Sequence, residues 1–238
     1  MPSHIVKSYD EQLRKLNDTL ARMGGVVESQ ISAAMQALAR RDPDLAMQTV
    51  EGDRRVDALE REVDAQVVNL LALRQPVASD LRLVVGSLRI ASDLERMADY
   101  AKNVAKRSIA LSQMAPVTPA HAVPRMGRVV QEMVQQVLDA FVHRDVDKAM
   151  AVWNRDEELD AMHDSLFREL ITHMMEDPRN ITPSTHLLFI AKNIERIGDH
   201  ATNVAEMVHY QVTGRTIAEA RPKGDSASLA VAQPEKRP

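Results

Sequence analysis

Several residue types and patterns are scarce in this 238-residue chain, and each shortage excludes a class of protein. Cysteine is absent, which excludes disulfide bonds and leaves only oxygen or imidazole ligands for any metal. The net charge is −4, so the chain lacks the basic excess that nucleic-acid-binding proteins usually show. No apolar run reaches about 18 residues, and the N-terminus lacks the hydrophobic segment of a signal peptide. We therefore expect a soluble, cytoplasmic protein that does not bind nucleic acid and reaches a membrane only through partners.

The residues that are abundant favour packed helices. Aromatic residues make up only 3% of the chain, while 45% of it is hydrophobic, mostly alanine, leucine, valine and methionine. Charged residues contribute a further 27%, and glycine occurs only 8 times. Such a composition is typical of helical bundles rather than of sheets.

The clearest pattern is a repeated stretch. Ile90–Lys106 reads IASDLERMADYAKNVAK, and 100 residues later Ile190–Glu206 reads IAKNIERIGDHATNVAE. Each copy has a glutamate, an aspartate four residues on, and an asparagine four residues further. A spacing of four keeps side chains on one face of a helix, so each copy presents a stripe of oxygen-bearing groups. These residues are Glu95, Asp99 and Asn103 in the first copy, and Glu195, Asp199 and Asn203 in the second.

Apolar periodicity, capping residues and prolines predict three helices in each half. The expected helices span approximately residues 8–40, 42–75, 78–113, 124–143, 146–176 and 182–213. Ser8 and Glu11 fit a capping box at the first start, and Thr182 precedes a proline at the last. Short connections favour antiparallel neighbours, so the expected fold is all-α, with two tandem three-helix bundles. The predicted units are a first repeat at 5–114, a proline-rich linker at 115–123, a second repeat at 124–213 and a disordered tail at 214–238.

The number of residues between each acidic residue and the nearest turn predicts that these residues lie at the same height in the bundle. In an antiparallel hairpin, equal distances from the turn mean equal height. Asp53 and Asp57 precede the turn near residue 77 by about as many residues as Glu95 and Asp99 follow it. The same holds in the second half for Asp156 and Asp160 with Glu195 and Asp199.

Four carboxylates at one level repel one another, so a compensating charge is needed. One candidate is a multivalent cation, for which carboxylate oxygens are suitable ligands. The alternative is a network of ion pairs with neighbouring arginines, namely Arg54, Arg55, Arg96 and Arg196. A third pattern, Glu206-x-x-His209 with Asp160-x-x-His163, has the spacing of ferritin-like di-iron sites, but neither histidine recurs in the other half.

These residues resemble the PhoU family of phosphate-transport regulators. The resemblance rests on LERMADYAKNVAK and IERIGDHATNVAE, on the acidic pairs upstream, and on the turn sequence RQPVASDLR at residues 74–82. It covers roughly residues 5–213 and implies two three-helix repeats whose acidic motifs bind multinuclear metal clusters. Iron or zinc is the first expectation, with manganese or magnesium as further candidates. The implied ligands are Asp53, Asp57, Glu95, Asp99, Asn103, Asp156, Asp160, Glu195, Asp199 and Asn203.

The resemblance also implies a function and partners. It suggests a homodimeric, non-enzymatic negative regulator of phosphate uptake and of the phosphate regulon. The implied partners are the ATPase subunit of the phosphate ABC transporter (PstB-like) and a sensor histidine kinase (PhoR-like). The alternative is a carboxylate-bridged di-metal enzyme, which would need an open coordination position and a substrate pocket. The polar tail has no expected role, and truncation after Gly214 is expected to leave the melting temperature nearly unchanged.

Overall fold

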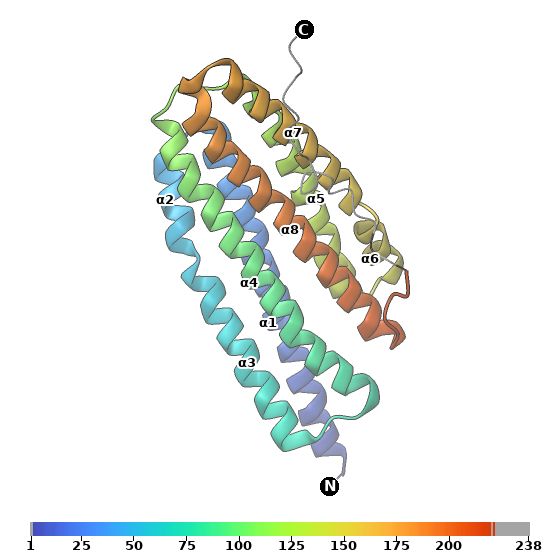
Figure 1. Cartoon of the computed structure of the whole chain (residues 1–238). Helices are drawn as coiled ribbons and strands as arrows, with labels where there is room; N and C mark the ends of the chain where they lie inside the picture. The colour runs from blue at the N-terminus through green and yellow to red at the C-terminus, as the bar shows by residue number, and fades with distance from the viewer. Residues whose placement is uncertain (1, 220, 222–238) are drawn as a thin grey trace.

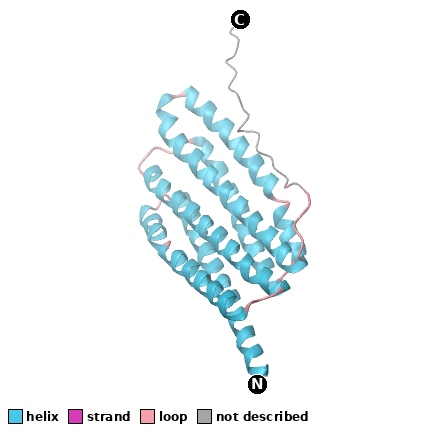
Figure 2. Cartoon of the chain, turned by 60° about the horizontal axis from the view of Figure 1, so that its bottom comes forward, coloured by secondary structure: helices cyan, strands magenta, loops and turns pink. Residues whose placement is uncertain are grey.

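The computed structural model describes residues 2–219 and residue 221. Within these residues the chain is helical without any strand, as Figure 2 shows. Its α-helices are α1 (Pro2–Arg40), α2 (Pro43–Gly52), α3 (Arg54–Arg74), α4 (Ala78–Ser112), α5 (Ala122–His143), α6 (Val146–Trp153), α7 (Asp156–Glu176) and α8 (Ile181–Thr213). Two short 3₁₀ helices, Thr118–His121 and Pro178–Asn180, lie in the connections.

The helices form two bundles that meet along a central pair. The first bundle contains α1, α4 and the α2–α3 segment, and the second contains α5, α8 and the α6–α7 segment. Helices α4 and α8 run in opposite directions and pack against each other at the centre of the molecule (Figure 1). The α3–α4 turn therefore lies near the N-terminus, whereas the α7–α8 turn lies at the opposite end. The predicted fold class of two tandem three-helix bundles is confirmed.

Equivalent aspartates start the second helical segment of each half. Asp42 accepts a hydrogen bond from the backbone N–H of Leu45 at 3.0 Å, and Asp145 accepts one from Lys148 at 2.9 Å. Each aspartate has extended backbone angles and so satisfies one of the free N–H groups at a helix start. Both starts agree with the sequence-based prediction.

The segments predicted as single helices at 42–75 and 146–176 are each interrupted once. The interruption is Asp53 alone in the first half, and Asn154 with Arg155 in the second. Asp and Asn side chains compete for backbone hydrogen bonds and tolerate helix ends better than helix interiors. As a result of these breaks, Asp53 and Asp156 lie at the starts of α3 and α7.

A close helix contact explains one of the two glycines inside α1. A Cβ atom added to Gly24 would lie 2.4 Å from Leu138 Cδ2 on α5, so any larger residue here would displace the Leu138 side chain at this contact between the two halves. A Cβ atom on the adjacent Gly25 would meet nothing within 4 Å. Buried alanines on α4 and α8, including Ala98, Ala101 and Ala201, belong to the core at the same central region.

Some predicted boundaries are wrong. Helix α1 begins at Pro2, so Ser8 lies inside a helix and is not its N-cap. The last helix begins at Ile181 after the 3₁₀ turn, so Thr182 lies inside it. The linker is not wholly irregular, because it contains the 3₁₀ helix Thr118–His121.

The segment after α8 can be compared with its prediction only in part. Residues 214–219 and 221 are described and irregular, and Ile217 packs against the core. The remainder of the predicted disordered tail lies outside the described residues. None of the described helices combines the length and the hydrophobicity that crossing a bilayer requires.

Candidate metal centre

The first carboxylate cluster joins the start of α3 to the middle of α4. Asp53 is buried, and its Oδ2 atom lies 2.5 Å from Nζ of Lys102, which also lies 2.5 Å from Oδ1 of Asp99. Gln30 on α1 donates a further hydrogen bond to Asp53 at 3.1 Å. Burial alone would lower the pKa of Lys102, but the hydrogen bonds to both aspartates hold it above its ordinary value. Lys102 therefore supplies the positive charge between two of the predicted ligands.

The structure adds Glu60 to this cluster. Burial raises the pKa of Glu95, and the charges of Asp99 and Glu60 raise it further. Burial also raises the pKa of Glu60, with contributions from Asp64 and Asp57. Asp57 itself is exposed. Glu60 could have been found from the sequence, because it precedes the turn by almost the same number of residues as Glu95 follows it.

The second cluster is more deeply buried. Asp156, Asp160 and Glu195 are 2%, 4% and 6% exposed, so their charges are largely removed from water. One carboxylate oxygen of Glu195 accepts a hydrogen bond from Lys192 at 2.8 Å, while the buried Oε2 has no hydrogen-bond partner among the described residues. Burial is the largest cause that raises the pKa of Glu195, and Asp199 and Asp160 add to it.

The cation that contacts the aspartates of the second cluster is Arg221, beyond the last helix. Its Nε and Nη2 atoms lie 2.7 and 2.8 Å from the two carboxylate oxygens of Asp156. Nη2 also lies 2.9 Å from Oδ1 of Asp199, and Nη1 donates to Asn203 at 3.4 Å. The segment after α8, to which the sequence assigned no role, therefore contacts the second cluster through Arg221. The sequence carries one signal for this contact, because Thr202 stands where the first repeat has Lys102, so the second motif has no lysine of its own at that position.

The two asparagines at the ends of the motifs differ in their surroundings. Asn203 on α8 donates to Asp93 on α4 at 3.2 Å, across the contact between the two halves. Asp93 also lies 2.7 Å from Nδ1 of His200. Asn103 on α4 is half-buried. Asn203 therefore links the second cluster to the central helix pair.

The arginines near the motifs do not form the network of ion pairs that was the alternative to a metal. Arg96 approaches Glu95 only at 3.8 Å, with its side chain 58% exposed. Arg196 lies over the ring of Tyr100, 5.6 Å from its centre, in the geometry of a cation–π contact. Arg54 and Arg55 are exposed. The cations that bridge the aspartates are instead Lys102 and Arg221.

The ferritin-like pattern does not converge on one site. Glu206 accepts a hydrogen bond from the indole N–H of Trp153 at 3.0 Å, whereas Nδ1 of His209 lies 3.0 Å from the carbonyl oxygen of Arg215. His163 is buried on α7, with Nδ1 3.8 Å from Asp164.

The donor atoms of the two clusters suit a hard cation, but their present arrangement does not hold one. Within the described part of the chain, no three histidine, aspartate or glutamate side chains are placed to share a metal ion. Lys102 and Arg221 lie between the aspartates where a cation would bind. The donors are carboxylate and amide oxygens, which divalent and trivalent ions prefer. The buried Oε2 atom of Glu195, which has no hydrogen-bond partner among the described residues, is a further oxygen that could bind a metal. The chemistry of these ligands therefore suits a metal ion, while Lys102 and Arg221 supply the cationic charge in the arrangement that the structure shows.

Comparisons with known proteins agree on one family. The PhoU domain matches residues 20–108 and again residues 123–208. A phosphate-specific transport system accessory protein PhoU homolog of Caulobacter vibrioides is 48% identical over 96% of this chain and 100% of its own length. The homolog of the same name from Rhizobium meliloti is 46% identical over 95% of this chain and 96% of its own.

Solved structures show the same likeness. The crystal structure of PhoU from Pseudomonas aeruginosa is 41% identical, covers 87% of this chain and 100% of its own, and has a TM-score of 0.85. The phosphate transport system regulatory protein PhoU from Streptococcus pneumoniae is 29% identical and covers 89% of this chain and 100% of its own, with a TM-score of 0.80. These relatives are named accessory or regulatory proteins, not enzymes.

Proposed function

This chain belongs to the PhoU family, and from that premise we propose that it is a metal-binding adaptor that represses phosphate uptake. Its role is accessory to phosphate transport rather than enzymatic, in line with its relatives. The proposed partners are the ATPase subunit of the phosphate ABC transporter and a sensor histidine kinase of the phosphate regulon. The observation that carries the proposal is the repeated carboxylate cluster, present in both halves of a chain with this family's fold.

We assign the metal ligands to the two clusters. Asp53, Asp57, Glu95, Asp99 and Asn103 would hold metal in the first half, together with Glu60. Asp156, Asp160, Glu195, Asp199 and Asn203 would hold it in the second. A bound iron, zinc, manganese or magnesium ion would neutralise the gathered carboxylates. Binding requires Lys102 and Arg221 to leave the aspartates, so each site exchanges a side-chain cation for a metal cation.

The metal proposal is tested by the metal content of the protein. The chain is purified without chelator and without a nickel column, and its metals are measured by elemental analysis. Asp99→Ala should lower the metal content of the first half, and Asp199→Ala that of the second. Asp139→Ala removes an exposed carboxylate outside both clusters and serves as the control. If the Asp99→Ala, Asp199→Ala double variant kept the full metal content, the assignment of the clusters would be wrong.

The adaptor proposal is tested in cells and by binding. Deleting the gene should switch on phosphate-starvation genes in phosphate-replete cells. The purified chain should bind the isolated ATPase subunit or the cytoplasmic domains of the kinase, and light scattering should report a dimer. Normal phosphate regulation in the deletion strain, together with no binding to either partner, would contradict this role.

A further inference from the structure

Gln30 joins the three helices that surround the first carboxylate cluster. It lies on α1 and is 7% exposed. Its amide Nε2 donates to Oδ1 of Asp53 at 3.1 Å and to the backbone carbonyl of Ala98 at 3.4 Å. Asp53 lies at the start of α3, and Ala98 directly precedes Asp99 on α4. One amide on α1 therefore ties together the two helices that carry the carboxylates of this cluster.

The orientation of this amide is defined by its surroundings. Both partners of Nε2 are hydrogen-bond acceptors, so the nitrogen must face them. An amide turned the other way would place its oxygen against two other oxygens. Oε1 is buried and has no hydrogen-bond partner among the described residues. Gln30 therefore acts on the cluster as a hydrogen-bond donor to Asp53.

Among the described residues, the side chain of Asp53 has two hydrogen-bond partners, one on each oxygen. Gln30 bonds Oδ1, whereas Lys102 lies 2.5 Å from Oδ2. The same lysine lies 2.5 Å from Oδ1 of Asp99. Asp53 makes no side-chain hydrogen bond to the first N–H groups of α3, unlike Asp42 at the start of α2. If a metal ion took the place of Lys102, Gln30 would still hold the other oxygen of Asp53.

The second half lacks this donor. The repeat places Met133 at the position of Gln30, 103 residues later, just as it places Asp156 at that of Asp53. Met133 is fully buried, and its thioether cannot donate a hydrogen bond. Both oxygens of Asp156 are bound by Arg221. The buried aspartate is therefore held from α1 in the first half and from the segment after α8 in the second.

We infer that Gln30 is a positioning residue of the first metal centre, which holds Asp53 in place for a metal ion that replaces Lys102. This role rests on the metal-binding function proposed above, and it belongs to a residue outside the acidic motifs. Carboxylates that bind metals are themselves hydrogen-bonded, and loss of such an outer partner typically lowers metal affinity by about 10–100-fold. Gln30 acts through Asp53 and does not touch the metal itself.

Metal titrations of proteins with one cluster disabled test this role. In the full-length chain, Asp199→Ala disables the second cluster and Asp99→Ala disables the first. Gln30→Met is introduced into each, since methionine is the residue that the second half carries at this position. In the Asp199→Ala protein, Gln30→Met should weaken the binding of manganese(II), measured by calorimetry, by about tenfold or more. In the Asp99→Ala protein, it should leave manganese binding unchanged.

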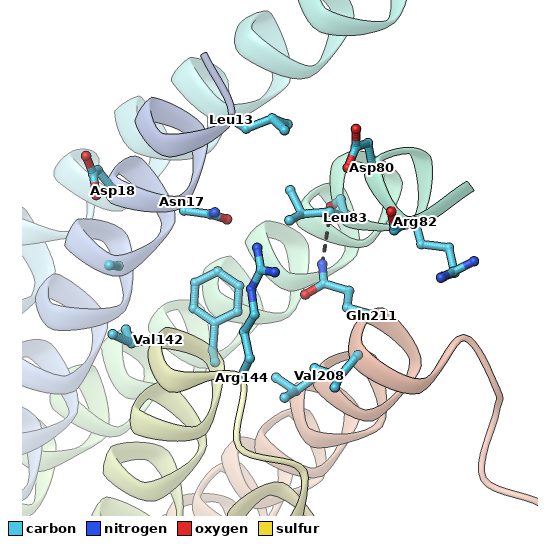
Figure 3. A pocket seen from close by; sticks show the side chains of 14 residues that line it. Leu13, Asn17, Asp18, Asp80, Arg82, Leu83, Val142, Arg144, Val208 and Gln211 are labelled. Carbon is cyan, nitrogen blue, oxygen red and sulfur yellow. Dashed lines mark hydrogen bonds between the residues drawn. The ribbon is translucent and has the colours of Figure 1, made fainter. Parts of the chain in front are cut away.

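A second glutamine provides the matched control. Gln211 on α8 is partly buried, and its Nε2 donates to the backbone carbonyl of Leu83 on α4 at 3.2 Å (Figure 3). Its amide has no carboxylate partner among the described residues. Gln211→Met removes a buried amide donor as Gln30→Met does, but the lost bond joins the end of α8 to the start of α4. It should leave manganese binding unchanged in both proteins.

Gln30→Ala keeps the test decisive if methionine perturbs the fold. It removes side-chain volume beside a groove of about 400 Å³, which Gln30 lines together with Ser29, Thr49 and Arg55. Water can enter such a polar space and donate to Asp53 in place of the amide. Gln30→Ala should therefore bind manganese more tightly than Gln30→Met, although its melting temperature should be lower.

The same titrations separate a failure of this role from a failure of metal binding. If the Asp199→Ala protein bound no manganese with Gln30 intact, the metal assignment of the first cluster and the role of Gln30 would both be wrong. If it bound manganese and Gln30→Met bound it equally well, only the positioning role would be wrong. Manganese affinities that followed the melting temperatures of the variants would also overturn it, because Gln30 would then only support the fold.

Discussion

Replacing Arg221 by alanine in the full-length chain tests whether this arginine holds the second cluster in place of a metal. The guanidinium is 15% exposed and contacts Asp156, which is 2% exposed. Removing one partner of a buried ion pair costs about 3–5 kcal/mol, because the remaining charge stays buried without compensation. At the low end, a loss of about 3 kcal/mol in a chain of this size corresponds to a fall of roughly 6–12 °C in melting temperature.

The same substitution should have the opposite effect on metal affinity. In the wild type, an incoming cation must first break the contact of Arg221 with Asp156 and Asp199. If about 3 kcal/mol of that cost is removed, metal binding at the second cluster should tighten by up to about 100-fold. The melting temperature is measured after metal has been removed, and affinity by calorimetric titration with zinc or manganese.

Two further variants serve as controls. Arg215→Ala removes an exposed arginine from the same segment and should change neither quantity. Arg221→Lys keeps the charge without the two-pronged geometry and should restore part of the stability. If Arg221→Ala left both the melting temperature and the metal affinity unchanged, the competition between Arg221 and metal would be refuted. Truncation after Gly214 should behave like Arg221→Ala, because it removes the same contact.

Three other predictions follow from burial and packing. Burial raises the pKa of the Glu195 carboxyl above its unfolded value of about 4.5. The protonated carboxyl therefore stabilises the fold at pH values below about 4.5, and this contribution is lost as the pH rises. In urea unfolding without metal, Glu195→Gln should be more stable than the wild type at pH 8 but not at pH 4. Gly25→Ala should raise the free energy of unfolding by about 0.5–1 kcal/mol, whereas Gly24→Ala should lower it by about 1 kcal/mol through its clash with α5. Arg41→Gly should lower the free energy of unfolding by about 2 kcal/mol, because hydrogen bonds to three carbonyls are lost, while Arg144→Gly should leave it unchanged or slightly higher. An equal effect of the two arginine substitutions in calorimetry would contradict a stabilising role for the hydrogen bonds of Arg41.

Much of the cluster arrangement followed from counting along the chain. The spacing of four placed Glu95 and Asp99 on one helix face, and the count from the turn placed Asp53 at their level. The structure brings Asp53 and Asp99 to the same lysine. The same count places Glu60 at this level, but Glu60 lies outside the paired aspartates that the resemblance implies as ligands.

Apolar periodicity and capping residues predicted helix breaks and helix starts least well. The breaks at Asp53 and at Asn154–Arg155 involve residues that a continuous helix also tolerates, so periodicity alone did not reveal them. The capping box at Ser8 and Glu11 predicts a helix start there, but α1 begins at Pro2, because the same four-residue pattern can also occur inside a longer helix.

The sequence by itself determined the helical class, the internal repeat and the carboxylate faces, because each depends on spacing along one helix or on counts from one turn. Only the tertiary structure decided which cations meet those carboxylates and which carbonyl oxygens Arg41 meets. Arg221 lies 65 residues from Asp156 along the chain, and Arg41 lies 70 from Leu111. Such contacts depend on where the chain turns after each long helix, and no local spacing encodes that direction. Of two arginines at equivalent positions, Arg41 therefore binds carbonyl oxygens of its own chain, whereas Arg144 is exposed.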